Sequence, residues 1–224
     1  MEDVKELVRI FSSIRSKTGQ GGWATFNKFL DVSLEAVQRL KMFDLKWRPD
    51  LGEFAKVEEE FVKGWAVLAK NFYPEETYRD VIGDLYMELS HSDKGFGQFF
   101  TPWHVAQMMA SITIGTPDLE TYTPQRPMTI CDPCCGSGVM LLAAASVLPR
   151  GFIDESRVAF YGMDIDLTCV KMARLNMGLY GLDRPMGFVK PTQDLTEDEI
   201  NKLPEPYKEK VQQTLFDLEQ KKAA

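Results

Sequence analysis

The chain has 224 residues, of which 44% are apolar and 26% charged, and its formal net charge is −7. This composition is typical of a folded globular protein, and the acidic balance argues against nucleic-acid binding by the whole surface, because phosphate attraction grows with the positive charge presented. No apolar run reaches the roughly 20 residues that a membrane span needs. The N-terminal stretch MEDVKELVRIFSSIR also lacks the apolar segment of a signal peptide. We therefore expect a cytoplasmic protein with no membrane partner.

Residues 1–94 have the pattern of an α-helical N-terminal domain. Apolar residues recur at helical spacing in four segments, which are residues 4–14, 25–42, 57–72 and 77–89. Pro74 is tolerated in the first turn of a helix, so we expect the fourth helix to begin close to it.

Residues 95–200 have a different pattern, in which short β-prone runs alternate with helical ones. The sequence predicts strands at 128–131, 157–163 and 186–190, and helices at 138–148 and 167–180. This alternation is typical of an α/β domain with a parallel sheet. Residues 201–224 are predicted to form a C-terminal helix, whose apolar stripe is Val211, Leu215, Phe216 and Leu218.

The junction between the first strand and its helix reads CDPCCGSG, residues 131–138. Cys131 and Cys134 have the spacing of a redox pair or of half a zinc site. A zinc site would need further ligands, and the chain has only two histidines and two other cysteines. A redox pair fits poorly because Cys131 lies inside the predicted strand. We interpret the cysteines as packed thiols and expect no metal.

The glycines of this junction favour a ligand at the carboxyl end of the sheet. Gly136 and Gly138 lead into a helix, whose first N–H groups bind anionic oxygens. Leu141 stands where a dinucleotide fingerprint has its third glycine, and the lysine of a phosphate-binding P-loop is missing. Asp132 ends the first strand and Asp164 the second. Such acids suit the amine and the ribose hydroxyls of S-adenosylmethionine, while Asp166 fits the N-cap of the following helix.

The motif DPCCGSG resembles the D-P-x-C-G-S-G signature of N6-adenine DNA methyltransferases, especially the modification subunits of type I restriction systems. Three further blocks are similar to that family and stand in the same order: DVIGDLYMEL at 80–89, GQFFTP at 97–102 and GMDIDLTCVKMARLNMGLYG at 162–181. The resemblance implies a Rossmann-like S-adenosylmethionine-dependent methyltransferase domain, preceded by the helical domain. It implies S-adenosylmethionine as cofactor, DNA as partner and methyl transfer to adenine N6.

The resemblance also implies a role for individual residues. Asp132 would face the amino group of the cofactor, Asp164 would accept from its ribose hydroxyls, and Asp194 matches weakly an aspartate near the adenine amine. Asp164 also fits an ordinary strand-end acid, and Asp194 a surface loop. The implied cofactor-binding set is Phe100, Thr101, Pro102, Asp132, Cys134, Gly136, Ser137, Gly138, Asp164, Ile165 and Asp194.

The family's N-P-P-[FYW] motif, which binds the flipped adenine, is absent from these residues. The nearest string, LPEPY at 203–207, has no asparagine and no strand-like residues before it, so we interpret it as chance. The catalytic residues are therefore unknown, and we expect the isolated chain to be inactive. Three interpretations stay open: a methyltransferase completed by other parts, a catalytically silent cofactor-binding or assembly subunit, and a relative that keeps only the fold.

Three strands also leave the sheet short of the seven that this fold usually has. The strand at 128–131 would then have an open edge, and such edges pair or are covered. We expect either a homodimer or partner subunit at this edge, or burial of Leu215, Phe216 and Leu218 over it.

Overall fold

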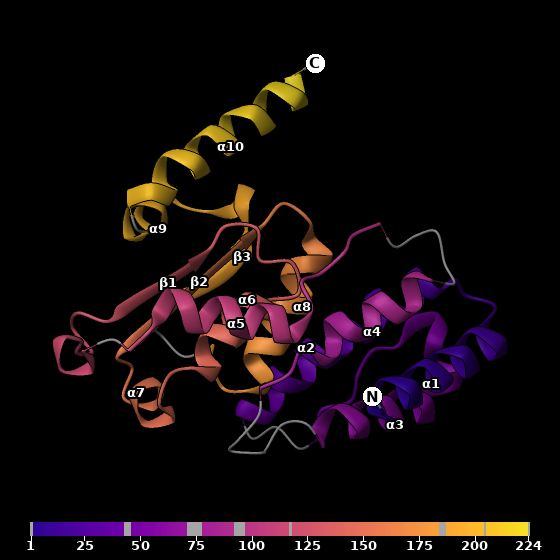
Figure 1. The fold of residues 1–224 in the computed structure, drawn as a ribbon. Coiled ribbons are helices and arrows are strands. Elements are labelled where there is room, and N and C mark those ends of the chain that lie inside the picture. Colours follow the sequence, from indigo (N-terminus) through magenta and orange to yellow (C-terminus); the bar gives the residue numbers. More distant parts are fainter. Residues whose placement is uncertain are drawn as a thin grey trace.

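The computed structural model describes residues 2–42, 46–70, 78–91, 97–116, 118–183, 187–203 and 205–223. Its N-terminal part is helical, a small sheet flanked by helices follows, and a long helix ends the chain (Figure 1). The helical part consists of α1 (Glu2–Thr18), α2 (Gly22–Lys41), the 3-10 helix η1 (Gly52–Val57), α3 (Glu58–Ala69) and α4 (Val81–Ser90).

The start of α4 differs from the predicted one. Residues 71–77, including Pro74, lie outside the described part of the chain, but residues 78–80 are not helical. The helix begins at Val81 because Asp80 is its N-cap, and the Asp80 carboxylate accepts a hydrogen bond of 2.7 Å from the N–H of Gly83. The predicted helix over 77–89 therefore starts too early.

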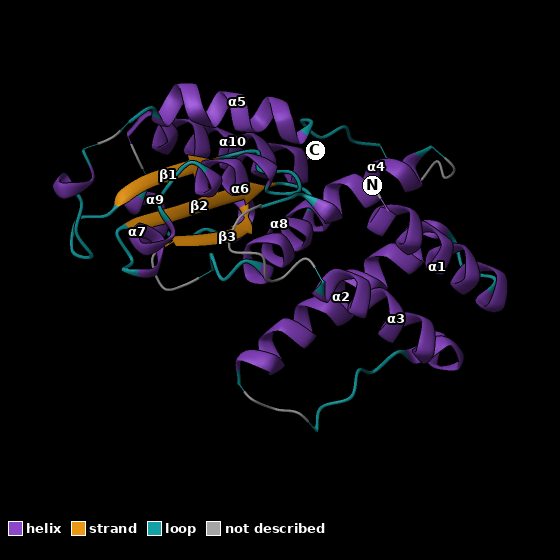
Figure 2. Ribbon diagram, turned by 60° about the horizontal axis from the view of Figure 1, so that its bottom comes forward, coloured by secondary structure: helices purple, strands orange, loops and turns teal. Residues whose placement is uncertain are grey.

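The sheet confirms the predicted α/β alternation. Strands β1 (Met128–Asp132), β2 (Val158–Asp164) and β3 (Gly187–Pro191) are parallel and lie in that order, with β1 and β3 at the edges (Figure 2). The crossovers contain α6 (Val139–Ser146) with the short α7 (Arg150–Asp154), and α8 (Leu167–Leu179). In the register Asp132 pairs with Gly162 and Asp164 with Pro191. The carboxyl ends of all three strands therefore meet at one side of the sheet.

Helix α5 (Trp103–Ile114) is not among the predicted elements. It buries Ala106 and Ala110 against α6, whereas Met108 and Ile112 on its other side are 57% and 75% exposed. With apolar residues on both sides, the segment has no helical hydrophobic periodicity to detect.

A single cluster of buried apolar side chains runs from the helical part into the sheet layer. It includes Leu7 and Phe11 of α1 as well as Leu141 and Leu142 of α6. Helix α2 also packs along α8. The division into domains at 1–94, 95–200 and 201–224 stays a prediction.

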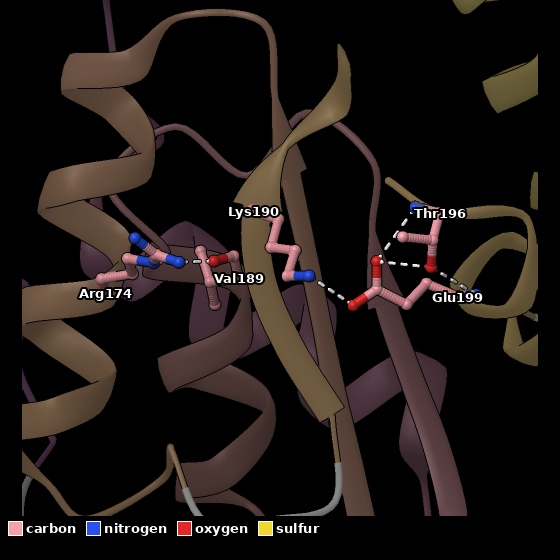
Figure 3. Close-up of polar contacts among 5 residues, drawn as sticks. All are labelled: Arg174, Val189, Lys190, Thr196 and Glu199. Carbon is pink, nitrogen blue, oxygen red and sulfur yellow. Dashed lines mark hydrogen bonds and ion pairs between the residues drawn. The ribbon is translucent and has the colours of Figure 1, made fainter. Parts of the chain in front are cut away.

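The chain after β3 is fastened to the sheet by polar contacts (Figure 3). It forms the 3-10 helix η3 (Thr192–Asp194), α9 (Glu197–Lys202) and α10 (Glu205–Ala223). Lys190 of β3 pairs with Glu199, and Glu199 also closes a capping box with Thr196. Arg174 of α8 donates a hydrogen bond of 2.9 Å to the carbonyl of Val189. These contacts anchor β3 on both sides.

The C-terminal helix α10 packs against the sheet through Val211 and Leu215. Val211 is 2% exposed and contacts Met163 of β2 together with residues of α9, and Leu215 is partly buried there. Phe216 is 56% exposed. The prediction that Leu215, Phe216 and Leu218 are together buried over the edge is therefore wrong.

The outer edge of β1 has no strand beside it in the part of the chain that the structure describes. The N–H of Met128 donates to the carbonyl of Arg157, at 2.9 Å, on the β2 side. Because successive residues of a strand alternate, Thr129 and Cys131 direct their N–H and C=O groups away from β2.

Across the described residues, no helix is long and apolar enough to cross a membrane.

Substitution Val211→Ala tests the docking of α10. It removes two buried carbon atoms, so we expect the free energy of unfolding to fall by about 1–3 kcal/mol in denaturant titrations. The matched change Phe216→Ala should cost less than about 0.5 kcal/mol, because that ring faces solvent. Equal effects of the two changes would contradict this packing.

Candidate cofactor-binding site

The loop after β1 takes a tight, glycine-dependent path. The N–H of Cys135 donates to the carbonyl of Met163 at 2.8 Å, and the N–H of Gly138 donates to the carbonyl of Cys135 at 2.7 Å. Gly136 and Gly138 have φ of 52° and 85°, a region that favours glycine. A Cβ on Gly138 would also lie 3.1 Å from the backbone of Ala173 in α8. The loop therefore passes close to both β2 and α8.

Asp164, at the end of β2, is joined to this loop. Its Oδ2 accepts a hydrogen bond of 3.0 Å from the N–H of Gly136, and its Oδ1 accepts one of 2.9 Å from the N–H of Asp166. Each carboxylate oxygen has two lone pairs, so both can accept one more donor. Asp166 is the N-cap of α8, as predicted, and accepts from the N–H of Thr168 at 2.7 Å.

Asp132 places a second carboxylate at the end of the neighbouring strand. Its Oδ1 accepts a hydrogen bond of 3.1 Å from the N–H of Cys134. Burial raises the pKa of Asp132 above its usual range, and the charge of Asp164 adds to the rise, whereas Lys210 of α10 opposes it. The two strand ends therefore form an acidic site that favours donors and positive charge.

The segment 97–102 lies against the same loop. The ring of Phe100 covers Gly136 so closely that a Cβ there would lie 2.9 Å from it. The hydroxyl of Tyr86 in α4 accepts from the N–H groups of Gly97 and Gln98, at 3.2 and 3.3 Å. The Gln98 side chain donates to Asp166 at 2.8 Å. The structure thus brings together two blocks that are about 35 residues apart in the sequence.

The remaining residues of the implied set are placed in three ways. Ile165 is 60% exposed beside Asp164. Asp194 is exposed at the end of η3, three residues after the end of β3. Ser137 is fully buried, with its backbone as well as its side chain inaccessible to solvent. Three more residues stand at the surface or half-buried near the loop: Thr101, Pro102 and Cys134.

A buried polar network beneath the loop contains Ser137 of the implied cofactor-binding set together with Asp80 and Asn176, which are not in that set. The hydroxyl of Ser137 donates to Asp80, and the side-chain amide of Asn176 donates to Asp80 at 2.7 Å and to the Ser137 carbonyl at 2.8 Å. Burial raises the pKa of Asp80 to about 6. The partners are 57 and 96 residues from Asp80 along the chain, so no local pattern indicates that these side chains contact Asp80.

Three of the four cysteines have thiol pKa values above the usual range, and the fourth, Cys134, is exposed. Burial raises the pKa of Cys131 to about 12 and also raises the pKa of Cys135 and Cys169. A neutral thiol is a poor nucleophile and a poor metal ligand. Within the described ranges, no three His, Cys, Asp or Glu side chains are grouped as metal ligands would be.

The LPEPY string does not lie at a strand end. Leu203 follows α9, while Glu205 and Tyr207 are in the first turn of α10; Pro204 lies outside the described residues. The string therefore has neither the residues nor the position of a base-binding motif.

Two cavities lie away from the strand ends. One, of about 260 Å³, lies between α2, α8 and β3 and is lined by residues that include Leu34, Phe160 and Arg174. The other, of about 220 Å³, lies among the N-terminal helices beside Trp47 and Trp65. Neither is lined by a residue of the implied cofactor set.

The strand-end site fits S-adenosylmethionine in its donor and acceptor groups. The loop leads into the start of α6 and has no side chain at half-buried Gly136 or at buried Gly138. Asp132 can accept from an amine, Asp164 can accept from a ribose diol, and Ile165 offers an exposed apolar side chain for an adenine ring.

Comparison with known proteins gives a family match. The family model described as N-6 DNA Methylase matches residues 77–217. The chain is 34% identical over 109 residues to a type I restriction enzyme MpnII methylase subunit of Mycoplasma pneumoniae, covering 46% of this chain and 18% of the relative. It is 34% identical over 103 residues to the type II methyltransferase M.VspI of a Vibrio species, covering 44% of this chain and 21% of the relative.

A solved type I restriction-modification methyltransferase subunit from Streptococcus thermophilus is 20% identical, with a TM-score of 0.41 over 85% of this chain and 40% of that one. This overlap is too low to support an inference. The match to the curated relatives spans only about a fifth of their length.

The buried carboxylate of Asp80 predicts a pH dependence of stability. Its pKa is about 6 in the folded chain against an ordinary 3.8, so its protonated form stabilises the fold, and this contribution is lost as the pH rises through 6. The whole effect is on the order of 3 kcal/mol, of which roughly 1 kcal/mol falls between pH 7 and 5. Relative to Asp80→Asn, the wild type should gain that free energy of unfolding when the pH is lowered. Parallel pH curves for the two proteins in denaturant titrations would contradict the assignment.

Proposed function

Because the chain belongs to the N-6 DNA methylase family, we propose that it is the cofactor-binding part of a methyltransferase acting on adenine N6 in DNA. The names of its relatives include methylase subunits of restriction systems, which supports a restriction-modification role. The match covers only a fifth or so of their length, so the activity, the substrate and the partners are part of this proposal. DNA as substrate implies a cytoplasmic protein.

The observation that carries the proposal is the link between Gly136 and Asp164. It joins a glycine loop at a helix start to a carboxylate at the adjacent strand end, with 3.0 Å between N and Oδ2. Ligands of open parallel sheets bind outside such strand ends. An acid and a loop held in one geometry can bind the ribose and the amino-acid part of one ligand without prior rearrangement.

The chain's own residues would bind and orient S-adenosylmethionine, which supplies the methyl group at its sulfonium. Asp164 would accept from the ribose hydroxyls, with Ile165 beside the adenine. Asp132 would accept from the amino group, and Phe100 with its neighbours Thr101 and Pro102 would border the methionine end. Asp194 would stand near the adenine amine.

The catalytic residues would come from outside these 224 residues. The amine of adenine is a weak nucleophile that must be positioned, and the sequence contains no N-P-P-[FYW] motif to do so. A partner subunit or another segment would supply it, and the outer edge of β1 would pair with that subunit or with a second copy of the chain. Among the described residues no strand lies beside Thr129 and Cys131 at that edge. Helix α5 lies on the β1 side of the sheet (Figure 2), and its Met108 and Ile112 are exposed.

The absence of that motif also favours a second candidate function. A catalytically silent subunit would bind S-adenosylmethionine at the same residues and contribute only regulation or assembly. The two functions share the site and differ in whether any complex containing this chain transfers a methyl group.

Calorimetry with S-adenosylmethionine tests the site. We expect the wild type to bind and Asp164→Ala to bind at least about tenfold more weakly, because the change removes the ribose acceptor and the support of the loop. Asp118→Ala is the control: it removes an exposed carboxylate before the other end of β1 and should bind as the wild type does. No binding by the wild type would leave only the fold-keeping interpretation.

Transfer of a labelled methyl group to adenine-containing DNA tests the missing chemistry. We expect no transfer by the isolated chain, and transfer after addition of a polypeptide that contains the N-P-P-[FYW] motif and associates with it. Turnover by the isolated chain would contradict the assignment of the catalytic residues to another segment.

A further inference from the structure

Asp80 connects the N-terminal helical part to the loop after β1 by hydrogen bonds. It belongs to the N-terminus of α4, yet its carboxylate accepts from Ser137, which lies between the two positive-φ glycines of the loop. Asp80 is 4% exposed, and Ser137 and Asn176 are fully buried. The contact is therefore shielded from water on both sides.

The orientation of the Asn176 amide shows that residue 80 must supply a hydrogen-bond acceptor. Its Nδ2 donates both to Asp80 and to the Ser137 carbonyl, whereas its buried Oδ1 has no hydrogen-bond partner among the described residues. Turning the amide over would place that oxygen against two acceptors. The Asn176 Oδ1 therefore stays without a partner in the described chain, because both N–H groups of the amide are directed at the Asp80 carboxylate and at the Ser137 carbonyl.

Three donors converge on the Asp80 carboxylate: the Gly83 N–H, the Asn176 amide and the Ser137 hydroxyl. The ionised group accepts from all three. A protonated group must itself donate, which reverses or breaks one of these bonds, and only the Ser137 hydroxyl can accept without the Asn176 amide turning over. Protonation of Asp80 therefore changes the hydrogen bond between its carboxyl group and Ser137 of the loop.

We propose that Asp80 is a positioning residue for cofactor binding: its ionised carboxylate fixes Ser137, and so holds the glycine loop in the geometry that faces Asp164. This inference rests on the proposed function, because the cofactor is the one assigned there. Glycines at 136 and 138 make the loop intrinsically adaptable, so an anchor at the residue between them lowers the entropy lost on binding.

The groups around Asp80 leave it as the pH-sensitive element of this network. Asp84 on its own helix raises its pKa, and Tyr180 of α8 also interacts with it. Arg79 precedes it in the chain, and α1 packs against α4 through apolar residues such as Leu7 and Phe11. Asp132 also titrates at the site, but it is common to every variant below.

Calorimetry with S-adenosylmethionine at pH 7.5 and pH 5 tests the proposal on the wild type, Asp80→Asn, Ser137→Ala and Asp84→Asn. With a pKa of about 6, Asp80 is ionised in about one molecule in eleven at pH 5, so the affinity of the wild type should fall about tenfold beyond any change seen in Asp80→Asn. At pH 7.5 Asp80→Asn should bind roughly three- to tenfold more weakly than the wild type. Ser137→Ala disconnects the carboxylate and should lose the extra pH dependence too.

Asp84→Asn is the matched control, because it removes a neighbouring carboxylate of α4 that makes no hydrogen bond to the loop within the described part of the chain. It should keep the wild-type affinity at pH 7.5, and its pH dependence should move to lower pH, because the charge of Asp84 raises the pKa of Asp80. A purely structural role is distinguished by stability, which for Asp80 rises as the pH falls while the affinity is expected to drop.

Equal affinities and equal pH dependence of the wild type and Asp80→Asn would overturn the proposal, as would a wild-type pH dependence in Ser137→Ala. Absence of binding by the wild type at pH 7.5 would instead overturn the proposed function and this inference with it. Binding by the wild type with no effect of Asp80 would overturn the inference alone.

Discussion

The hydrogen bond between the Gly136 N–H and the Asp164 carboxylate is the contact on which the site depends. It crosses from the loop after β1 to the end of β2, and it exists only because parallel strands bring these ends to one side of the sheet. The positive φ of Gly136 turns its N–H toward the acid, and the Phe100 ring occupies the space that a side chain there would need. Strand order, glycine and aromatic ring are thus parts of one arrangement.

The buried Asp80 carboxylate supports this loop, and its charge lowers the free energy of unfolding. Asp80 is a carboxylate in the protein interior, where burial disfavours its charge, and three hydrogen bonds only partly offset that penalty. A chain selected only for stability would do better with a neutral group at this position. The charge gains a purpose if it fixes Ser137 and so the loop. It would also make the N-terminal helices part of the proposed cofactor site, through the Asp80 carboxylate.

Local patterns in the sequence were sufficient for the strands, for α8 and for the Asp166 cap, because each is encoded within a few residues. They were not sufficient for α5, whose exposed Met108 and Ile112 remove the usual polar face. The position of α10 depends on the packing of Val211 against Met163 of the sheet, which is a contact between segments far apart in the sequence. The Asp80 network is non-local in the same way. Sequence reasoning therefore placed the carboxylates at the strand ends, but not the residues that support the loop between them.

The most direct measurement of the central claim is a crystal structure of the chain with S-adenosylmethionine. The account predicts the nucleoside at the carboxyl ends of β1 and β2, with its ribose hydroxyls about 2.7 Å from the Asp164 oxygens and its amino-acid end beside Asp132. A nucleoside bound instead in the cavity between α2 and β3, or an empty loop region at saturating ligand, would contradict it.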